Sequence, residues 1–427
     1  MPRITSRARS LRTLYRARKR ILIEESDSDT DAVDEAMAEN LEFTATILSK
    51  RYLDRPSKYR NRNFDADKAF YEWINDSRYV VFTHMTRSSF EFVHEMIKDD
   101  IVFVNPNPRS TSHQRSVYFQ LFIAVSRFVS DGDGWCFNRV CESFEVGHGT
   151  ILLYTERVCT ALSRHEKKWV SWPNALQRRE LSALGEAKYG FPGFIASCDG
   201  TLIALRRAPA FDQYPETYHH HRHGGYGFNV LFWVDHHGSI IRFTCNWPAS
   251  ASDQTIFDSS AFACNPWGHL SKQNEEYIFV DLGFKREVFA VPPYKGKEAK
   301  EEHNALFNHA QRRGRVKVAV SFVLLRHITL LQVEHANGVI KARFASLKGM
   351  PIDIRSNADH LRCAAWITSC VVLHNILIVL RDEFEYEEPA QVDVDDGIDV
   401  QSAPQGKAFQ DAVRDRWLMD VQRWERV

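Results

Sequence analysis

Three acidic residues, far apart in the sequence, occupy positions where an ionised side chain is costly unless it has a function. Asp199 lies within the apolar stretch 195–201, and Asp281 ends the apolar stretch 277–281. Glu334 lies beside the apolar face of a predicted helix over 333–344. A carboxylate in an apolar strand persists only when a cation, a hydrogen-bond network or a functional site compensates its charge.

Two carboxylates on neighbouring strands and a third on a packed helix would form an oxygen-only ligand set. Such a set suits Mg²⁺ or Mn²⁺ and does not suit zinc. Two such ions can activate a water and stabilise the leaving oxygen in phosphodiester cleavage. From the residues alone an alternative stays open, because a strand-end Asp is often a turn former and a helix Glu is often solvated.

The elements that would position these acids follow from hydrophobic periodicity. Short stretches rich in β-branched and aromatic residues predict strands at 194–205, 227–234, 240–247 and 277–282. Apolar residues at three and four spacing predict helices from about 64 to 180 and again from 281 to about 385. The order of elements predicts a mixed α/β layer structure.

The stretch 136–162 predicts two helices joined by a short turn at 145–149. This outline is typical of a helix-turn-helix, whose second helix could enter a DNA major groove. Any packed helical hairpin gives the same pattern, and no Arg or Lys crowds the start of the second helix.

Several short motifs in the sequence resemble those of a known protein family. The sequence resembles the PIF/Harbinger transposase-derived nucleases of the DDE superfamily, whose catalytic core is RNase H-like. The matching pieces stand in family order: CDGT at 198–201, GYGFN at 225–229, SDQTIF at 252–257, VDLGF at 280–284, FNHAQRR at 307–313, VEHANGVIKARF at 333–344 and LHN at 373–375.

The resemblance implies an RNase H-like mixed sheet with flanking helices, preceded by an all-helical region with a helix-turn-helix. It implies that Asp199, Asp281 and Glu334 are the catalytic, metal-binding triad for Mg²⁺ or Mn²⁺, and it makes Asp253 a further metal-ligand candidate of less certain role. It also implies a DNA substrate and a separate Myb-like accessory protein.

The chain departs from this family between the second and third acids. Asp281 and Glu334 are separated by 52 residues, and removing the 17 residues 316–332 restores the family spacing and wording. Because the segment starts with Val and ends with Gln, its ends are compatible with splice sites, and a retained intron or gene-model artefact is one hypothesis. A real added element is the alternative, which would displace Glu334 or pack as an extra apolar segment.

Basic residues near the acids are candidates for DNA phosphate contacts. Arg222 lies in a His-rich loop, where a metal site is the less favoured interpretation. The other candidates flank Asp281 and Glu334; a charged, solvated loop would explain them equally well. They are Lys285, Arg286, Arg312, Arg313 and Lys341.

Composition limits the remaining possibilities. The 427 residues carry 55 Lys plus Arg and 55 Asp plus Glu, so a DNA-binding role requires local basic patches. Residues 1–20 hold eight basic residues and no acid, while 21–40 hold eight acids and no Lys or Arg. The first block is typical of a nuclear-localisation or phosphate-binding patch, or of a solubility tail. No apolar run predicts a membrane span or a secretory signal, and the eight cysteines lack metal-finger spacing.

These observations predict a disordered charged tail at 1–40, a helical region at 41–185, a nuclease domain at 190–385 containing the insert, and an acidic linker and tail at 386–427. The predicted function is a metal-dependent DNA endonuclease of transposase ancestry, located in the nucleus or otherwise in the cytoplasm. The alternative is a domesticated or degenerate DNA-binding protein that keeps the fold and does not cut. The sequence leaves the oligomeric state open.

Overall fold

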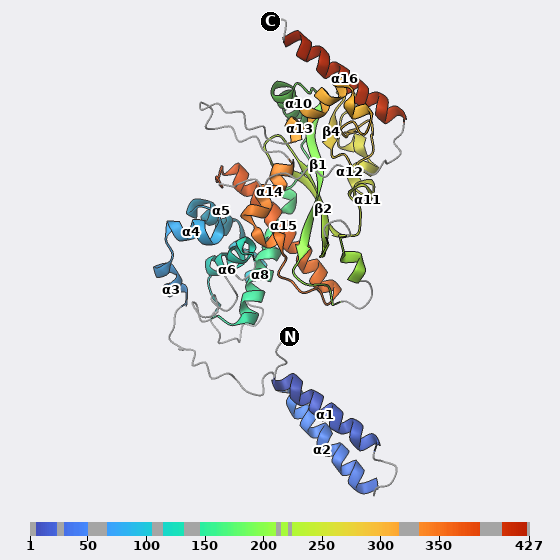
Figure 1. Cartoon of the computed structure of the whole chain (residues 1–427). Helices are drawn as coiled ribbons and strands as arrows, with labels where there is room; N and C mark the ends of the chain where they lie inside the picture. The colour runs from blue at the N-terminus through green and yellow to red at the C-terminus, as the bar shows by residue number, and fades with distance from the viewer. Residues whose placement is uncertain are drawn as a thin grey trace. The chain divides into compact units, whose positions relative to one another are not determined.

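The computed structural model describes residues 6–23, 30–49, 66–104, 114–131, 146–210, 215–220, 224–315, 333–384 and 404–424. The chain divides into two compact units, residues 1–64 and 65–427. Figure 1 shows a helical hairpin in the first unit and a sheet with helices on both faces in the second.

The first unit is a pair of packed helices, α1 (Ser6–Ile23) and α2 (Thr30–Ser49). Arg18 Nε donates to Asn40 Oδ1 over 3.3 Å, and Asn40 Nδ2 donates to the Leu14 carbonyl over 3.1 Å. The sequence predicts a disordered tail at 1–40, and the structure differs. The physical reason is that the basic and acidic blocks form separate helices of opposite charge, joined by buried Asn40.

The second unit is built on a five-stranded mixed sheet with the order β3-β2-β1-β4-β5. Its strands are β1 (Phe194–Leu205), β2 (Tyr226–Val234), β3 (Ile240–Pro248), β4 (Tyr277–Val280) and β5 (Ala290–Val291). Strand β2 pairs antiparallel with β1 and β3, whereas β4 runs parallel to β1 and to β5. The predicted mixed α/β class is confirmed, and β1 to β4 occupy the four predicted strand positions.

Helices precede, interrupt and follow this sheet. Those before it are α3 (Ala66–Trp73), α4 (Asp76–Thr83), α5 (Arg87–Ile97), α6 (Val117–Val129), α8 (His148–Ser163), α9 (Glu166–Trp169) and α10 (Ala175–Tyr189). Those after β3 are α11 (Asp253–Asp258), α12 (Ala261–Cys264), α13 (Glu302–Arg315), α14 (Val333–Arg343), α15 (Asn357–Val379) and α16 (Pro404–Trp424). Single 3-10 turns lie at Ile101–Phe103, Pro215–Tyr218, Pro266–Gly268, Glu298–Lys300 and Ala345–Lys348.

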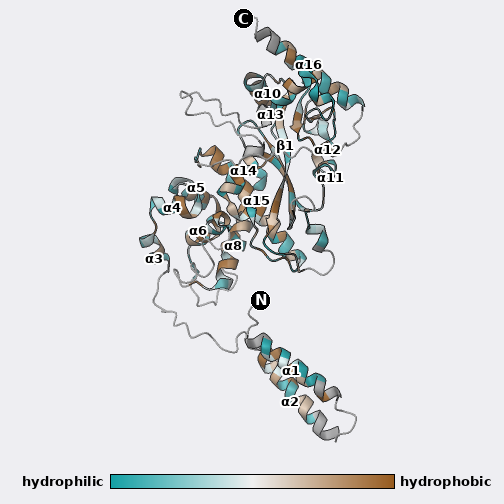
Figure 2. Ribbon diagram, viewed as in Figure 1, coloured by the Kyte–Doolittle hydropathy of each residue, from teal (hydrophilic) through white to brown (hydrophobic). Residues whose placement is uncertain are grey.

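Three hydrophobic clusters hold the second unit together. In the largest cluster, the helices from α3 through α8, together with α14 and α15, pack on one face of β1 and β2. The second lies on the opposite face, under α11 and α12, and the third packs α13 and α16 against β1, β4 and β5. Figure 1 shows α14 and α15 on one side of the sheet and α11 and α12 on the other, and Figure 2 shows apolar residues along α15.

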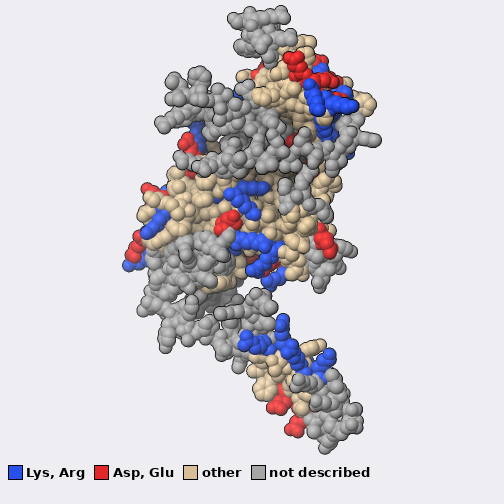
Figure 3. Space-filling model, in the orientation of Figure 1, with Lys and Arg blue, Asp and Glu red and all other residues tan. Residues whose placement is uncertain are grey.

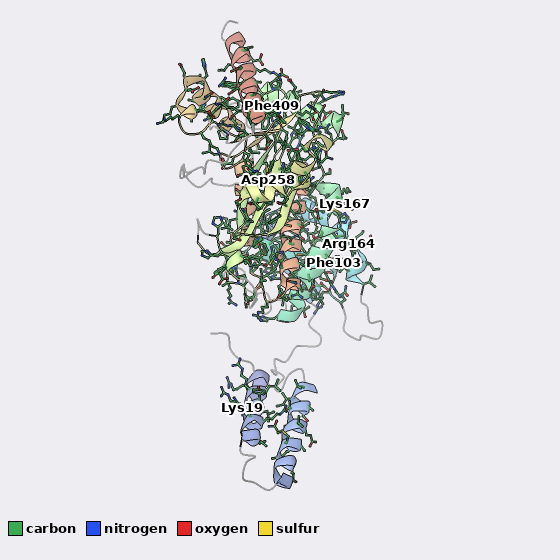
Figure 4. All side chains as sticks on the ribbon, turned by 90° about the vertical axis from the view of Figure 1, so that its right-hand side faces the viewer. Lys19, Phe103, Arg164, Lys167, Asp258 and Phe409 are labelled. Atoms are coloured by element: carbon green, nitrogen blue, oxygen red, sulfur yellow. The ribbon has the colours of Figure 1, made fainter. Side chains whose placement is uncertain are left out.

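These clusters place the domain boundaries differently from the sequence prediction. The expected helical region at 41–185 shares one continuous core with the sheet, because helix α8 packs against both α6 and α15. The expected tail at 386–427 contains α16, where the Phe409 ring lies 5.9 Å from the Tyr277 ring (Figure 4). Burying the apolar face of α16 on the sheet edge makes it part of the second unit.

Helix α15 contains the LHN motif and lies within the stretch from 281 to about 385 that is predicted to be helical. It is the described helix that is long and apolar enough to cross a membrane, but 78% of its most apolar window is buried inside the protein. For the predicted helix-turn-helix, the second helix corresponds to α8, while residues 132–145, with the first helix and the first residue of the turn, lie outside the described residues. The predicted insert 316–332 also lies outside them.

Candidate metal centre

The parallel pairing of β1 and β4 brings two of the predicted ligands to adjacent positions. Cys198 on β1 is in register with Val280 on β4, so Asp199 and Asp281 are the next residues on two neighbouring strands. Neighbouring strands lie about 4.8 Å apart. Cys198 and Val280 both belong to the cluster under α11 and α12. Since side chains alternate along a strand, the two Asp positions belong to the opposite face, where α13 and α14 pack.

Helix α14 covers Asp199 and is tied to β1 by two hydrogen bonds. Asn337 Nδ2 donates to Asp199 Oδ2 over 3.1 Å, and Lys341 Nζ donates to the Leu202 carbonyl over 2.9 Å. Glu334 lies in the first turn of α14, three residues before Asn337 and seven before Lys341. Residues at these spacings share one face of a helix, so Glu334 occupies the α14 face that meets β1. Its side chain lies outside the described part of the structure.

Burial controls the charge states around Asp199. Desolvation lowers the pKa of Lys341 to about 8, although the negative charge of Asp199 favours the protonated ammonium. Burial also raises the pKa of the Cys198 thiol, and the charges of Asp199 and Asp253 raise it further. Cys198 therefore stays a neutral thiol and offers no thiolate to a metal.

Asp253 reaches the same strand from the other side. A Cβ atom on Gly200 would lie 2.4 Å from both Asp253 carboxylate oxygens, so the missing side chain of Gly200 makes room for this carboxylate. Asn229 Nδ2 donates to Asp253 Oδ1 over 2.6 Å. Gly200 follows Asp199 directly, and consecutive residues of a strand face opposite sides. The structure thus brings Asp253 to β1 on the face opposite to Asp199, where it is hydrogen-bonded to Asn229.

The donor set at Asp199 fits a hard divalent cation. Asp199 and Asp281 offer carboxylate oxygens from adjacent strands, and Asn337 Oδ1 is a buried oxygen without a hydrogen-bond partner. Mg²⁺ and Mn²⁺ prefer such oxygen ligands. Among the described side chains, which exclude Glu334, no three His, Cys, Asp or Glu groups converge on one point.

The structure gives several predicted DNA-contact residues partners within the chain. Lys285 Nζ lies 3.0 Å from Asp258 Oδ2, and Arg286 Nη2 donates to Glu298 over 2.6 Å with its side chain only 14% exposed. The Lys341 ammonium is buried, so its contact is with β1 and a DNA phosphate could not reach it without rearrangement. The side chains of the three remaining candidates lie outside the described part of the chain; these are Arg222, Arg312 and Arg313.

Asn337 contacts Asp199 but is absent from the site residues predicted from the sequence. Its signal was available, because it stands three residues after Glu334 and so shares the helix face on which Glu334 lies. The side-chain amide of Asn337 carries no charge, so the cost of burying a charge does not single it out before its partner is known.

Residues 198–375 match the family model of the DDE superfamily endonucleases. This segment begins at the residue before Asp199, contains Asp281 and Glu334, and ends at Asn375 of the LHN motif. No curated protein and no solved structure gives a significant match. The five-stranded mixed sheet with flanking helices is consistent with a DDE nuclease fold.

Proposed function

We propose that the protein is a divalent-metal-dependent DNA endonuclease of transposase ancestry, of the PIF/Harbinger type, with an RNase H-like core. The observation that carries the proposal is the register of β1 and β4, which makes Asp199 and Asp281 neighbours within the segment that matches the DDE endonucleases. The family match supports a nuclease and a DNA substrate.

In this proposal Asp199, Asp281 and Glu334 would hold divalent cations, which would supply an activated water and stabilise the leaving oxygen. Hydrolysis would form a bond from the water oxygen to phosphorus and break the bond from phosphorus to the leaving oxygen, and the proton lost by the water would end on that leaving oxygen. Asn337 fixes one oxygen of Asp199, and Lys341 holds α14 against β1. The hydrophobic clusters around these residues keep the geometry rigid before DNA binds.

A separate surface supports DNA binding. Arg9, Arg12, Arg16 and Lys19 are exposed on α1 at spacings of three, four and three, and we call these four residues the basic stripe. They lie on one helix face, while half-buried residues such as Leu14 and Arg18 face α2. Figure 3 shows Lys and Arg side chains gathered along α1, and Figure 4 labels Lys19 there. We propose that the basic stripe contacts DNA phosphates.

The same basic segment is the basis for proposing a nuclear location. A Myb-like accessory protein remains a proposal drawn from the family resemblance. The runner-up function is a DNA-binding protein that no longer cuts, and the insert 316–332 before Glu334 favours it if the segment is translated in the cell.

Nicking of supercoiled DNA by the purified full chain in Mg²⁺ tests the proposal. The wild type should nick, and chelation of the metal or the Asp199→Ala or Asp281→Asn variant should abolish nicking while DNA binding persists. Asp258→Asn is the matched control and should nick as the wild type does, because Asp258 is an acid that pairs with Lys285 at the surface. DNA binding without metal-dependent cutting, both in the wild type and in a chain lacking 316–332, would support the runner-up.

A further inference from the structure

One buried polar atom beside Asp199 has no hydrogen-bond partner among the described residues. Asn337 is 9% exposed, and its Oδ1 atom is buried without a hydrogen bond. A buried carbonyl oxygen without a partner costs about 1–3 kcal/mol, so its presence beside Asp199 calls for a physical explanation.

The nitrogen atom of the same amide has a partner. Asn337 Nδ2 donates to Asp199 Oδ2 over 3.1 Å. Because Nδ2 and Oδ1 are bonded to one carbon, the unpartnered oxygen lies next to the Asp199 carboxylate. An oxygen acceptor beside a carboxylate attracts a cation or a water molecule that a cation polarises, whereas a second anion would be repelled.

Another buried asparagine shows what a purely structural role looks like in this fold. Asn375 on α15 donates through Nδ2 to the carbonyls of Trp169 and Ile240, and its Oδ1 accepts from the Ile240 amide. Every polar atom of its side chain is paired. Asn337 is buried to a similar degree but keeps one oxygen open at the predicted metal ligand.

We propose that Asn337 is a positioning residue of the cation site, in addition to the three acids. Its Nδ2 holds Asp199 Oδ2 and so orients the Asp199 carboxylate toward the cation. Its Oδ1 accepts a hydrogen bond from a water molecule bound to that cation. Mg²⁺ and Mn²⁺ usually keep several waters, and groups that orient ligands in this way commonly change metal affinity about 10–100-fold. This inference rests on the proposed function.

The test compares Asn337→Leu with Asn375→Leu in the full chain. Leu has nearly the shape of Asn without its polar atoms, so the variant at 337 removes the unsatisfied oxygen. We expect Asn337→Leu to weaken Mn²⁺ binding about 10–100-fold, measured by titration calorimetry or by the EPR signal of free Mn²⁺, with an unchanged or higher Tm in metal-free buffer. Asn375→Leu should lower the Tm and leave Mn²⁺ affinity unchanged.

The outcomes separate this inference from the function on which it rests. One outcome is that the wild type binds Mn²⁺, Asp199→Ala does not bind it, and Asn337→Leu binds it with the affinity of the wild type. In that case the inference about Asn337 is overturned and the proposed function stands. A lower Tm with unchanged Mn²⁺ affinity would likewise identify Asn337 as merely structural. If the wild type binds no Mn²⁺, both the proposed function and this inference are overturned.

Discussion

Gly200 and Asp253 form a contact whose energetic consequences can be predicted in sign and size. A Cβ atom at position 200 would lie 2.4 Å from the Asp253 carboxylate, a distance that real Cβ contacts do not show. In Gly200→Ala the carboxylate must therefore move. The same carboxylate accepts the 2.6 Å hydrogen bond from Asn229, so its displacement loses that bond as well.

The expected cost of Gly200→Ala is about 1–3 kcal/mol, which is typical of inserting one methyl group into a packed site. For a unit of this size, this corresponds to a fall in Tm of about 1–4 °C. In an Asp253→Ala background the obstacle is gone. There the same substitution should cost nothing or stabilise by up to about 1 kcal/mol, because Gly is unfavourable in a strand.

The assay is thermal unfolding of the wild type, both single variants and the double variant, each in metal-free buffer. We expect a coupling free energy of about 1–3 kcal/mol between the two positions. Equal costs of Gly200→Ala in both backgrounds would refute the steric reasoning. Mn²⁺ titration of Asp253→Ala then tests its less certain metal role: retained affinity would agree with its place on the face opposite to Asp199.

Three further predictions concern other parts of the chain. Replacing the four residues of the basic stripe by Gln should reduce the slope of log K for duplex DNA binding against log salt concentration by about 3 to 4. Replacing its three Arg by Lys should preserve this slope. Equal slopes for the wild type and the Gln variant would exclude phosphate contacts. Burial lowers the pKa of His236 to about 4, and its Nε2 atom pairs with the Phe194 carbonyl. Since this folded pKa lies below the unfolded value near 6.5, the contribution of His236 to the free energy of unfolding should be fully present above pH 6.5. It should fall as the pH drops towards 4, by an amount on the order of 3 kcal/mol. His236→Gln should flatten this pH dependence in unfolding experiments, and an unchanged dependence would contradict the prediction. Deleting 316–332 should leave the Tm equal or higher and the rate of nicking equal or faster. A translated messenger RNA that retains the 51 nucleotides encoding 316–332 would contradict the hypothesis of a retained intron or gene-model artefact.

Local pattern was sufficient for part of the fold. Short stretches rich in β-branched and aromatic residues predicted β1 to β4, and the prediction of helices after 281 agrees with α13, α14 and α15. It was insufficient for the domain boundaries. Whether α16 is a tail or part of the sheet unit depends on an apolar surface that distant strands assemble, and the sequence around 404–424 does not contain that surface.

The sequence alone determined which residue types could bind a cation, because an acid within an apolar strand is costly wherever the chain folds. Only the tertiary structure decided which of these acids are neighbours. Strand register placed Asp199 beside Asp281, side-chain alternation placed Asp253 on the other face of β1, and packing of α14 made Asn337 a partner of Asp199. The physical reason is that burial cost is a property of each residue, whereas coordination depends on distances between residues remote in the chain.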